Sequence, residues 1–274
     1  MSQERDAFPI VGIGASAGGL EALRELLRFL PADAGMAYVL VQHLDPRHES
    51  LLPTLLARAT GMRVHEAREG MIVEADHIYV IAPNTDMTLA QDMLQLVPRT
   101  EAGGQHLSIN TFLRSLAESR AAGAMGVILS GTAADGTLGL HAIKAEGGMT
   151  FAQEPSTAQF AGMPQSAIDA GCVDFVGSPE EIARELARMS RHPYVHQAPV
   201  VEAEEAQAAP PGQASPSREP GFQQILRLLH RRTDTDFSAY KPATLERRIG
   251  RRMALLQIDH LAQYLTYLSD HQAE

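Results

Sequence analysis

Short apolar segments alternate with amphipathic segments through the first 190 residues, and this alternation limits the fold more than any other feature of the sequence. The apolar segments carry Val, Ile and Leu at consecutive positions, as in Val127-Ile128-Leu129. Consecutive apolar residues predict strands that are buried on both faces, which is typical of parallel sheets covered by helices on both sides. The sequence therefore predicts an α/β fold with a doubly wound, mostly parallel sheet.

The alternation also predicts where the individual elements lie. The predicted strands are Pro9–Gly14, Ala37–Gln42, His77–Ala82, Ala124–Ser130, Met149–Ala152 and Cys172–Val176. The predicted helices are Gly18–Leu30, Glu49–Ala59, Ile109–Arg120, Thr137–Ala145, Pro164–Ala170 and Pro179–Ser190. Ser178, Pro179 and Glu181 predict a capping box with proline in the first turn of the last helix. The looser alternation of Asp86–Val97 predicts a β-hairpin.

The composition changes after residue 195. Residues 196–220 are mostly Ala, Pro, Gln and Glu, with no Val, Leu or Ile after Val201, so we expect a disordered linker there. The chain should then divide into a domain at 1–195, the linker, and a small all-helical domain at 221–274. The whole chain has a net charge of −10, but this last part holds eight Lys or Arg against six Asp or Glu. An acidic body is therefore followed by a mildly basic tail.

Composition also disfavours several classes of protein. The overall acidity argues against nucleic-acid binding. A single cysteine, Cys172, cannot form an internal disulfide and favours a reducing, cytoplasmic location. The N-terminus is too charged for a signal peptide, and no apolar stretch is long enough to span a membrane, so we expect no membrane insertion. No helical His-x-x-x-His or Glu-x-x-His pattern occurs, so we expect neither a metal nor another cofactor.

A first candidate site lies in the loop Gly14-Ala15-Ser16-Ala17-Gly18-Gly19, after the first predicted strand. The loop matches Gly-x-Ser-x-Gly, a sharp turn that exposes a serine hydroxyl beside a helix N-terminus, where N–H groups can stabilise an oxyanion. One alternative is a glycine turn with a capping serine. Another is a dinucleotide-binding glycine loop, but that site needs an acidic residue ending the second strand, and Asp45 comes after the strand has ended.

Two further loops supply candidate partners for Ser16. His43 directly follows the second strand and could act as the general base, although other histidines remain possible, namely His48, His65, His77, His106 and His141. Asp135 lies in a glycine-bounded turn after the strand Ala124–Ser130. It could simply cap the following helix, or it could accept the Nδ1–H of His43 and hold its tautomer. The order Ser-His-Asp differs from the Ser-Asp-His order of α/β-hydrolases.

Together these loops show a family resemblance. Residues 9–190 resemble the catalytic domain of the chemotaxis protein-glutamate methylesterases, the CheB family. The matching segments are Val11–Gly19, Val41–Leu44, Gly126–Gly131, Asp135-Gly136 and Gly162–Ile168. The resemblance implies a triad of Ser16, His43 and Asp135 that hydrolyses γ-glutamyl methyl esters on chemoreceptor helices and releases methanol. It also implies oxyanion support from the backbone of Ala17 and Thr132, and receptor glutamine deamidation in some members.

The sequence departs from the family pattern in places. Many members read Gly-Met-Gly-Asn-Asp-Gly where this chain has Gly131–Gly136, and the usual Pro and Asp are missing from Leu107–Asn110. These changes bear on contacts with the substrate more than on the triad. The family's receiver domain is not expected, because the first strand begins near Pro9. Phosphorylation of such a domain should therefore not regulate this chain.

The tail resembles a second family. Leu228–Met253 is similar to the N-terminal helical domain of the CheR receptor methyltransferases, so we expect the front part of an esterase–methyltransferase fusion. The S-adenosylmethionine domain would follow Glu274, and we therefore expect no methyltransferase activity. Four arginines share one face of a predicted helix, which is either a solvated face or a contact surface for an acidic protein: Arg247, Arg248, Arg251 and Arg252.

Two classes of function follow from these features. The favoured class is a serine esterase acting on methylated chemoreceptors. The alternative is a catalytically silent scaffold or receptor-binding module. The presence of Ser16, His43 and Asp135 favours the esterase.

Overall fold

The computed structural model describes residues 8–42, 51–99, 107–196, 220–233, 235–237, 240 and 242–271. The chain divides into two compact units, Met1–Pro199 and Val200–Glu274. The predicted linker lies outside the described residues, except for its two end residues. His43 also lies outside them.

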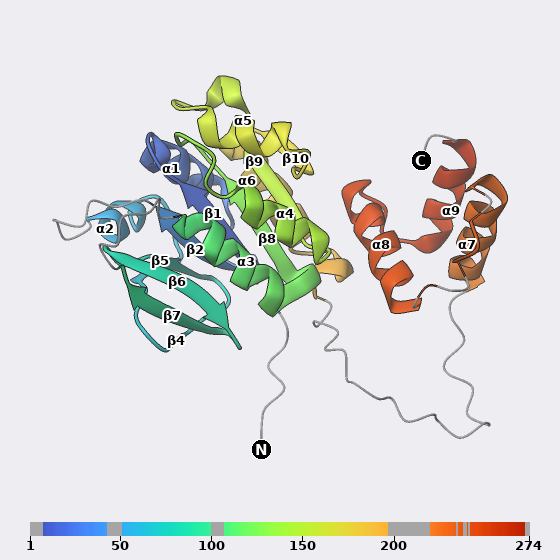
Figure 1. Ribbon diagram of the computed structural model, residues 1–274, viewed down its shortest axis with the longest axis horizontal. Coiled ribbons are helices and arrows are strands. Elements are labelled where there is room, and N and C mark those ends of the chain that lie inside the picture. The colour runs from blue at the N-terminus through green and yellow to red at the C-terminus, as the bar shows by residue number, and fades with distance from the viewer. Residues whose placement is uncertain are drawn as a thin grey trace, which may run out of the picture. The chain divides into compact units, whose positions relative to one another are not determined.

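A parallel sheet forms the centre of the first unit (Figure 1). Within the described part of the chain it has seven strands, in the order β10-β9-β8-β1-β2-β5-β3. The strands are β1 (Ile10–Ala15), β2 (Ala37–Gln42), β3 (Arg63–Glu66), β5 (His77–Val80), β8 (Ala124–Ile128), β9 (Met149–Gln153) and β10 (Phe175–Gly177). Ile10 of β1 pairs with Ala37 of β2 on one side and with Ala124 of β8 on the other. The predicted doubly wound sheet is confirmed.

Helices cover both faces of this sheet. They are α1 (Gly19–Phe29), α2 (Leu52–Leu56), α3 (Ser108–Arg120), α4 (Thr137–Ala145), α5 (Gly162–Asp169) and α6 (Pro179–Met189). Helices α3 and α4 pack together on one face, and α1 and α6 pack together on the other (Figure 1). Helix α6 begins with the predicted capping box, in which the Glu181 N–H donates to Ser178 Oγ and the Ser178 N–H donates to Glu181.

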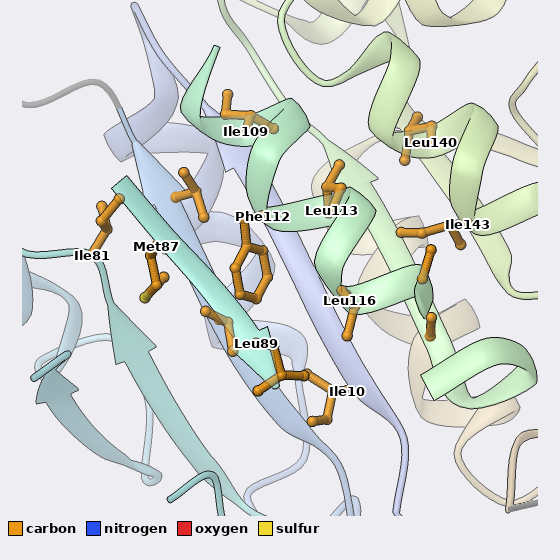
Figure 2. Close-up of a cluster of buried hydrophobic side chains, with 14 of the residues drawn as sticks. Ile10, Ile81, Met87, Leu89, Ile109, Phe112, Leu113, Leu116, Leu140 and Ile143 are labelled. Atoms are coloured by element: carbon orange, nitrogen blue, oxygen red, sulfur yellow. The ribbon is translucent and has the colours of Figure 1, made fainter. Parts of the chain in front are cut away.

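Helix α3 lies over the middle of the sheet. Its buried side chains form one cluster with those of α4: Ile109, Phe112, Leu113, Leu116, Leu140 and Ile143 (Figure 2). Gly12 in β1 makes this close packing possible, because a Cβ there would lie 2.6 Å from Leu113 Cδ2. Packing in the core thus fixes the position of α3 relative to the strand that leads to Ser16.

A small antiparallel sheet, in the order β4-β7-β6, is a second layer of the first unit. Strands β6 (Thr85–Ala90) and β7 (Met93–Pro98) are the predicted hairpin, and β4 (Met71–Ile72) pairs with β7. The sequence did not predict strands β3 and β4. Strand β3 lies at the edge of the main sheet with Arg63 and Glu66 exposed, so it lacks the apolar run on which the prediction depended.

Several elements are shorter than predicted, and two of them differ most clearly at one end. Of the predicted helix at 49–59, the described residues keep only α2, which ends before Ala57. The last strand begins at Phe175 instead of Cys172. The Thr150 N–H donates to the carboxylate of Asp174 at 3.1 Å, so a side chain takes the place of a main-chain partner just before that strand.

The described residues of the second unit form three α-helices, which are α7 (Pro220–Thr233), α8 (Pro242–Leu255) and α9 (Leu261–Asp270). They enclose a small apolar core of their own, made of Phe222, Ile225, Leu245, Ile249, Met253, Tyr264 and Leu268. This confirms the predicted all-helical tail. In the described parts of both units, no helix is long and apolar enough to cross a membrane.

Candidate active site

The strands that precede the predicted site residues in the sequence are neighbours in the sheet. Strand β1 lies between β2 and β8, and it leads directly to Ser16. Strand β2 ends at Gln42, one residue before His43, and β8 leads to the loop that carries Asp135. The sheet order therefore brings the chain segment of the predicted nucleophile between those of the predicted base and acid, although His43 itself is not among the described residues.

Ser16 forms the turn between β1 and α1. Its N–H donates to the carbonyl of Ser130 at 2.9 Å, and its carbonyl accepts the N–H of Gly19 at 2.9 Å. The N-cap of α1 is Gly18, in the left-handed region with φ 69°, and this residue makes no side-chain capping bond. Glycine adopts this conformation without strain, so the N-cap position belongs to Gly18 and not to Ser16.

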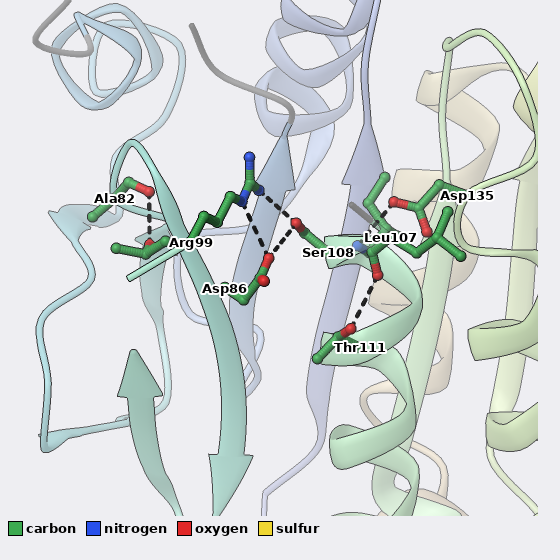
Figure 3. A network of polar contacts seen from close by, with 9 residues as sticks. Ala82, Asp86, Arg99, Leu107, Ser108, Thr111 and Asp135 are labelled. Carbon is green, nitrogen blue, oxygen red and sulfur yellow. Dashed lines mark hydrogen bonds and ion pairs between the residues drawn. The ribbon is translucent and has the colours of Figure 1, made fainter. Parts of the chain in front are cut away.

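Asp135 is a buried carboxylate, with 3% of its surface exposed. Its Oδ2 accepts the N–H of Ile109 at 3.1 Å, and its Oδ1 accepts the N–H of Asn110 at 3.0 Å and of Gly136 at 2.9 Å. Figure 3 shows Asp135 beside the beginning of α3. Two of these donors belong to the first turn of α3. The helix N-terminus and the hydrogen bonds together compensate the buried charge.

The alternative structural role of Asp135 was assigned to the wrong helix. The N-cap of α4 is Gly136, with φ 96° and no side-chain capping bond from the N-cap residue itself. Asp135 caps α3 instead, which lies more than 20 residues earlier in the chain. This contact depends on the packing of α3 against α4, so the local sequence did not indicate it.

Asn110 bonds to the turn that carries Asp135, which the sequence did not indicate. Its Oδ1 accepts the N–H of Gly136 at 3.1 Å and of Gly139 at 2.8 Å, at the start of α4. The side chain is 5% exposed, so these bonds form away from bulk solvent. The only signal in the sequence was that Asn110 stands where the resembling family usually has Asp.

The β6–β7 hairpin is fastened to the same end of α3. Ser108, the first residue of α3, donates its hydroxyl proton to Asp86 Oδ1 at 2.6 Å (Figure 3). Arg99 bonds to both partners, with Nε 3.2 Å from Asp86 Oδ1 and Nη2 2.5 Å from Ser108 Oγ. These bonds connect the hairpin to the first turn of α3, and the N–H groups of that turn donate to Asp135.

The two predicted oxyanion donors lie in the loops that meet at Ser16. Ala17 is half-buried and Thr132 is exposed, and among the described residues neither N–H has a hydrogen-bond acceptor. The two loops approach each other closely at Gly131, where a side chain would not fit. A Cβ at this position would lie 3.0 Å from Ser16 Cβ and 2.2 Å from Met163 Sδ. The Ser16 N–H is already bonded to Ser130, so it is not a further donor for an oxyanion.

The alternative bases are placed differently. His65 and His77 lie on β3 and β5, where their rings stack with centroids 5.3 Å apart, and β5 and β2 separate β3 from β1. His141 lies in α4, and His48 and His106 are outside the described residues. In the described ranges, no three His, Cys, Asp or Glu side chains come together in a way that could hold a metal ion.

The four arginines predicted to share one helix face all lie in α8. Arg248 and Arg252 are exposed, whereas Arg247 and Arg251 are half-buried. The four residues therefore differ in how much of their side chains a partner could reach.

Comparison with protein families gives two matches. The CheB methylesterase family model matches residues 11–186. The model for the all-alpha domain of the CheR methyltransferases matches residues 220–274.

Individual relatives agree with these matches. A putative protein-glutamate methylesterase/protein-glutamine glutaminase of Leptospira interrogans is 33% identical over 186 residues, covering 68% of this chain and 96% of that protein. A Burkholderia orbicola protein-glutamate methylesterase/protein-glutamine glutaminase 3 is 36% identical, and the match covers 65% of this chain and 52% of that protein. An uncharacterised 104.1 kDa protein of Rhodobacter capsulatus is 34% identical over 81% of this chain, which spans only 24% of the longer protein.

A solved structure has the same fold. The crystal structure of the Thermotoga maritima CheB methylesterase catalytic domain superposes with a TM-score of 0.63 at 28% sequence identity. The match covers 67% of this chain and 99% of that domain. Because the family model spans most of the first unit and the Leptospira relative matches over almost its whole length, the chain belongs to the CheB methylesterase family, followed by a CheR-type all-alpha domain.

Proposed function

We propose that the first unit is a serine esterase that removes methyl esters from glutamate side chains of chemoreceptors. The observation that carries this proposal is the sheet order β8-β1-β2, because it presents Ser16 between the segments that carry Asp135 and His43. Family membership supports the activity, and the names of the Leptospira and Burkholderia relatives support the substrate class.

In the proposed mechanism, Ser16 Oγ attacks the ester carbonyl while His43 takes the hydroxyl proton. The tetrahedral oxyanion is stabilised by backbone N–H groups, for which Ala17 and Thr132 are our candidates. The intermediate collapses, His43 returns the proton to the leaving methoxide, and methanol departs. Water then attacks the acyl-enzyme with His43 again as base, which releases the glutamate carboxylate and restores Ser16. No cofactor takes part in these steps.

Asp135 has two roles in this proposal. As the acid of the triad it orients His43 and stabilises the imidazolium that forms. Its bonds to the N–H groups of Ile109, Asn110 and Gly136 hold the carboxylate in place before the substrate binds. The same acyl-enzyme could form from a glutamine side chain with loss of ammonia, and the names of the relatives make deamidation the second candidate activity.

The second unit is proposed to bind the receptor. Arg248 and Arg252 present positive charge on the exposed side of α8, which fits an acidic protein surface. A catalytically silent receptor-binding module is the alternative for the whole chain. The two functions differ in whether the chain hydrolyses the methyl ester, because a silent module would bind the receptor and release no methanol.

The decisive experiment measures methanol release from a methylated chemoreceptor fragment. The wild-type chain should release methanol, and Ser16→Ala should lower the rate on the order of 10⁴-fold or more. Its melting temperature should stay close to that of wild type, because Gly18 and not Ser16 is the N-cap of α1. Ser178→Ala is a control that removes a serine hydroxyl far along the chain and should retain activity. Equal rates for wild type and Ser16→Ala would refute the assignment.

A further inference from the structure

A second serine, Ser130, lies directly beneath the Ser16 turn. It follows β8 by two residues and is 1% exposed. A Cβ on Gly18 would lie 2.8 Å from Ser130 Oγ, so the hydroxyl is in close contact with the turn itself. The mechanism proposed above does not use this hydroxyl.

Ser130 bonds to three segments of the site. Its carbonyl accepts the Ser16 N–H at 2.9 Å, and its hydroxyl donates to the carbonyl of Ala17 at 2.8 Å. The hydroxyl also accepts the Phe160 N–H at 3.0 Å, and the Ser130 N–H donates to Gln153 Oε1 at 2.9 Å. One residue therefore joins the Ser16 turn to the end of β9 and to the loop before α5.

The two bonds to the Ser16 turn have a geometric consequence. Ser130 holds the peptide group that carries the Ser16 N–H and the peptide group that carries the Ala17 carbonyl. The peptide between them joins Ser16 to Ala17 and carries the Ala17 N–H. Because peptide groups are planar, fixing the two neighbours restricts the direction of this N–H and of the Ser16 Cα–Cβ bond.

We propose that the Ser130 hydroxyl is a positioning group for catalysis, which sets the orientation of Ser16 and of the Ala17 N–H without touching the substrate. This inference rests on the proposed esterase function. Small displacements of a nucleophile or an oxyanion donor lower the rate of the chemical step steeply, by ~10²-fold for about 1 Å. The role should therefore appear in kcat more than in KM.

The Ser130 hydroxyl also holds the loop before α5. The Phe160 carbonyl accepts the N–H of Gly131 at 2.9 Å, and the Phe160 N–H donates to Ser130 Oγ. Phe160 itself is 40% exposed. Loss of the hydroxyl would leave the Ala17 carbonyl and the Phe160 N–H without their shared partner, so both loops should shift together.

Ser115 offers a matched control. Its hydroxyl has the same pattern of bonds, because it accepts the Leu89 N–H at 2.9 Å and donates to the Phe112 carbonyl at 2.8 Å. It lies in the middle of α3, against β6, and makes none of the described contacts with the Ser16 turn. Ser115→Ala therefore removes the same chemistry from the fold but not from the site.

The experiment compares kcat and KM on a small methyl ester for the full chain, with melting temperatures measured in parallel. Ser130→Ala should lower kcat ~10- to 100-fold with KM changed less than about threefold, and Ser115→Ala should keep kcat within about twofold. If Ser130→Ala fails to fold, Ser130→Thr and Ser130→Val form a second pair of nearly equal shape that differs in the hydroxyl. The threonine variant should then exceed the valine variant at least about tenfold in kcat.

The outcomes separate the two proposals. Ser130→Ala with wild-type kcat, or equal kcat for the threonine and valine variants, would overturn the positioning role while the esterase proposal stands. Equal losses in Ser130→Ala and Ser115→Ala would also overturn it, because the effect would then come from stability. A wild-type chain that hydrolyses no ester would overturn both.

Discussion

Asp135 and Asn110 cap each other's helices. The carboxylate of Asp135, just before α4, accepts the N–H groups of Ile109 and Asn110 at the start of α3. The carboxamide of Asn110, in α3, accepts the N–H groups of Gly136 and Gly139 at the start of α4. Both side chains also share the Gly136 N–H. The position of the proposed triad acid is therefore tied to the packing of two core helices.

Asn110→Ala should destabilise the fold and lower activity. The variant removes an acceptor from the Gly136 and Gly139 N–H groups, and Gly139 loses its described partner in the turn. Leaving a buried donor unpaired costs about 1–3 kcal/mol, so the free energy of unfolding should fall by about that amount in chemical denaturation. Thr111→Ala is the neighbouring control, because its exposed hydroxyl bonds only to the Leu107 carbonyl. Equal stabilities for the two variants would contradict the capping role.

Asn110→Asp separates hydrogen bonding from charge. The aspartate keeps an oxygen acceptor, but it places a second carboxylate beside Asp135 at the shared N–H of Gly136. Two carboxylates in one site repel each other until one binds a proton. This variant should therefore be less stable than wild type at pH 7, and the difference should shrink as the pH falls towards 4. A difference that grows on acidification would show that the two carboxylates do not interact.

Asp135→Asn should impair both catalysis and folding. The amide cannot stabilise an imidazolium, so kcat should fall by up to ~10⁴-fold, as in other triads. It also replaces one acceptor oxygen by an N–H₂ donor that faces the α3 amides, so the free energy of unfolding should fall by about 1–3 kcal/mol. Ester turnover and chemical denaturation measure the two effects. Unimpaired turnover would exclude Asp135 from the triad, and unimpaired stability would contradict its capping of α3.

His65 should make stability depend on pH. Desolvation by burial, followed by the charges of His77 and Arg63, lowers the pKa of His65 below 6.5. The unfolded chain then binds this proton more readily than the folded chain, so stability should fall as the pH drops through about 6.5 and below. His65→Gln should remove this part of the loss, which melting temperatures at pH 7.5 and 5.5 would reveal. His141→Gln, a change in α4, is the control. An unchanged pH dependence in His65→Gln would contradict this assignment.

The sequence predicted the fold well where short-range pattern and packing agree. The bounds of β2 and α4 match the prediction fully, and α6 begins at the predicted Ser178 capping box. The sequence also indicated that Ser16, His43 and Asp135 each follow a different predicted strand. The strand order β8-β1-β2 shows that the three strands preceding these residues are neighbours.

The sequence did not predict contacts made across the fold. The bonds from Asp135 to α3 and from Ser130 to Ala17 join segments 25 or more residues apart, and no local pattern records them. Strand β3 was missed because an edge strand with exposed charged residues has no apolar run. The residues that hold the site in place were therefore harder to find than the residues proposed to react.

The end of the first unit determines where a truncated esterase should stop. The domain predicted from the sequence ends at residue 195. Tyr194 and Val195 are each 1% exposed, and the Tyr194 hydroxyl donates to the Gly147 carbonyl at 2.6 Å. His196 bonds to the Ser190 carbonyl at 2.6 Å. A truncated esterase should therefore end at Pro199, where the first compact unit ends.

The second unit should strengthen receptor binding by charge and leave chemistry unchanged. The chain ending at Pro199 should keep the kcat of the full chain on a small ester, because the proposed triad lies in the first unit. On an acidic receptor fragment it should bind more weakly. Exposed charges are screened over ~8 Å at physiological salt, so the difference should shrink as salt rises.

Charge reversal tests which arginines are responsible. Arg248→Glu with Arg252→Glu changes the two exposed residues of α8 and should reproduce the weaker binding of the truncated chain. Arg227→Glu, at an exposed position of α7, is the matched control for a change of charge elsewhere in the unit. Binding of the three forms is measured at low and high salt. Equal weakening by the α8 and α7 changes would mean that net charge acts without a defined surface, and unchanged binding in all forms would leave the α8 arginines as a solvated face.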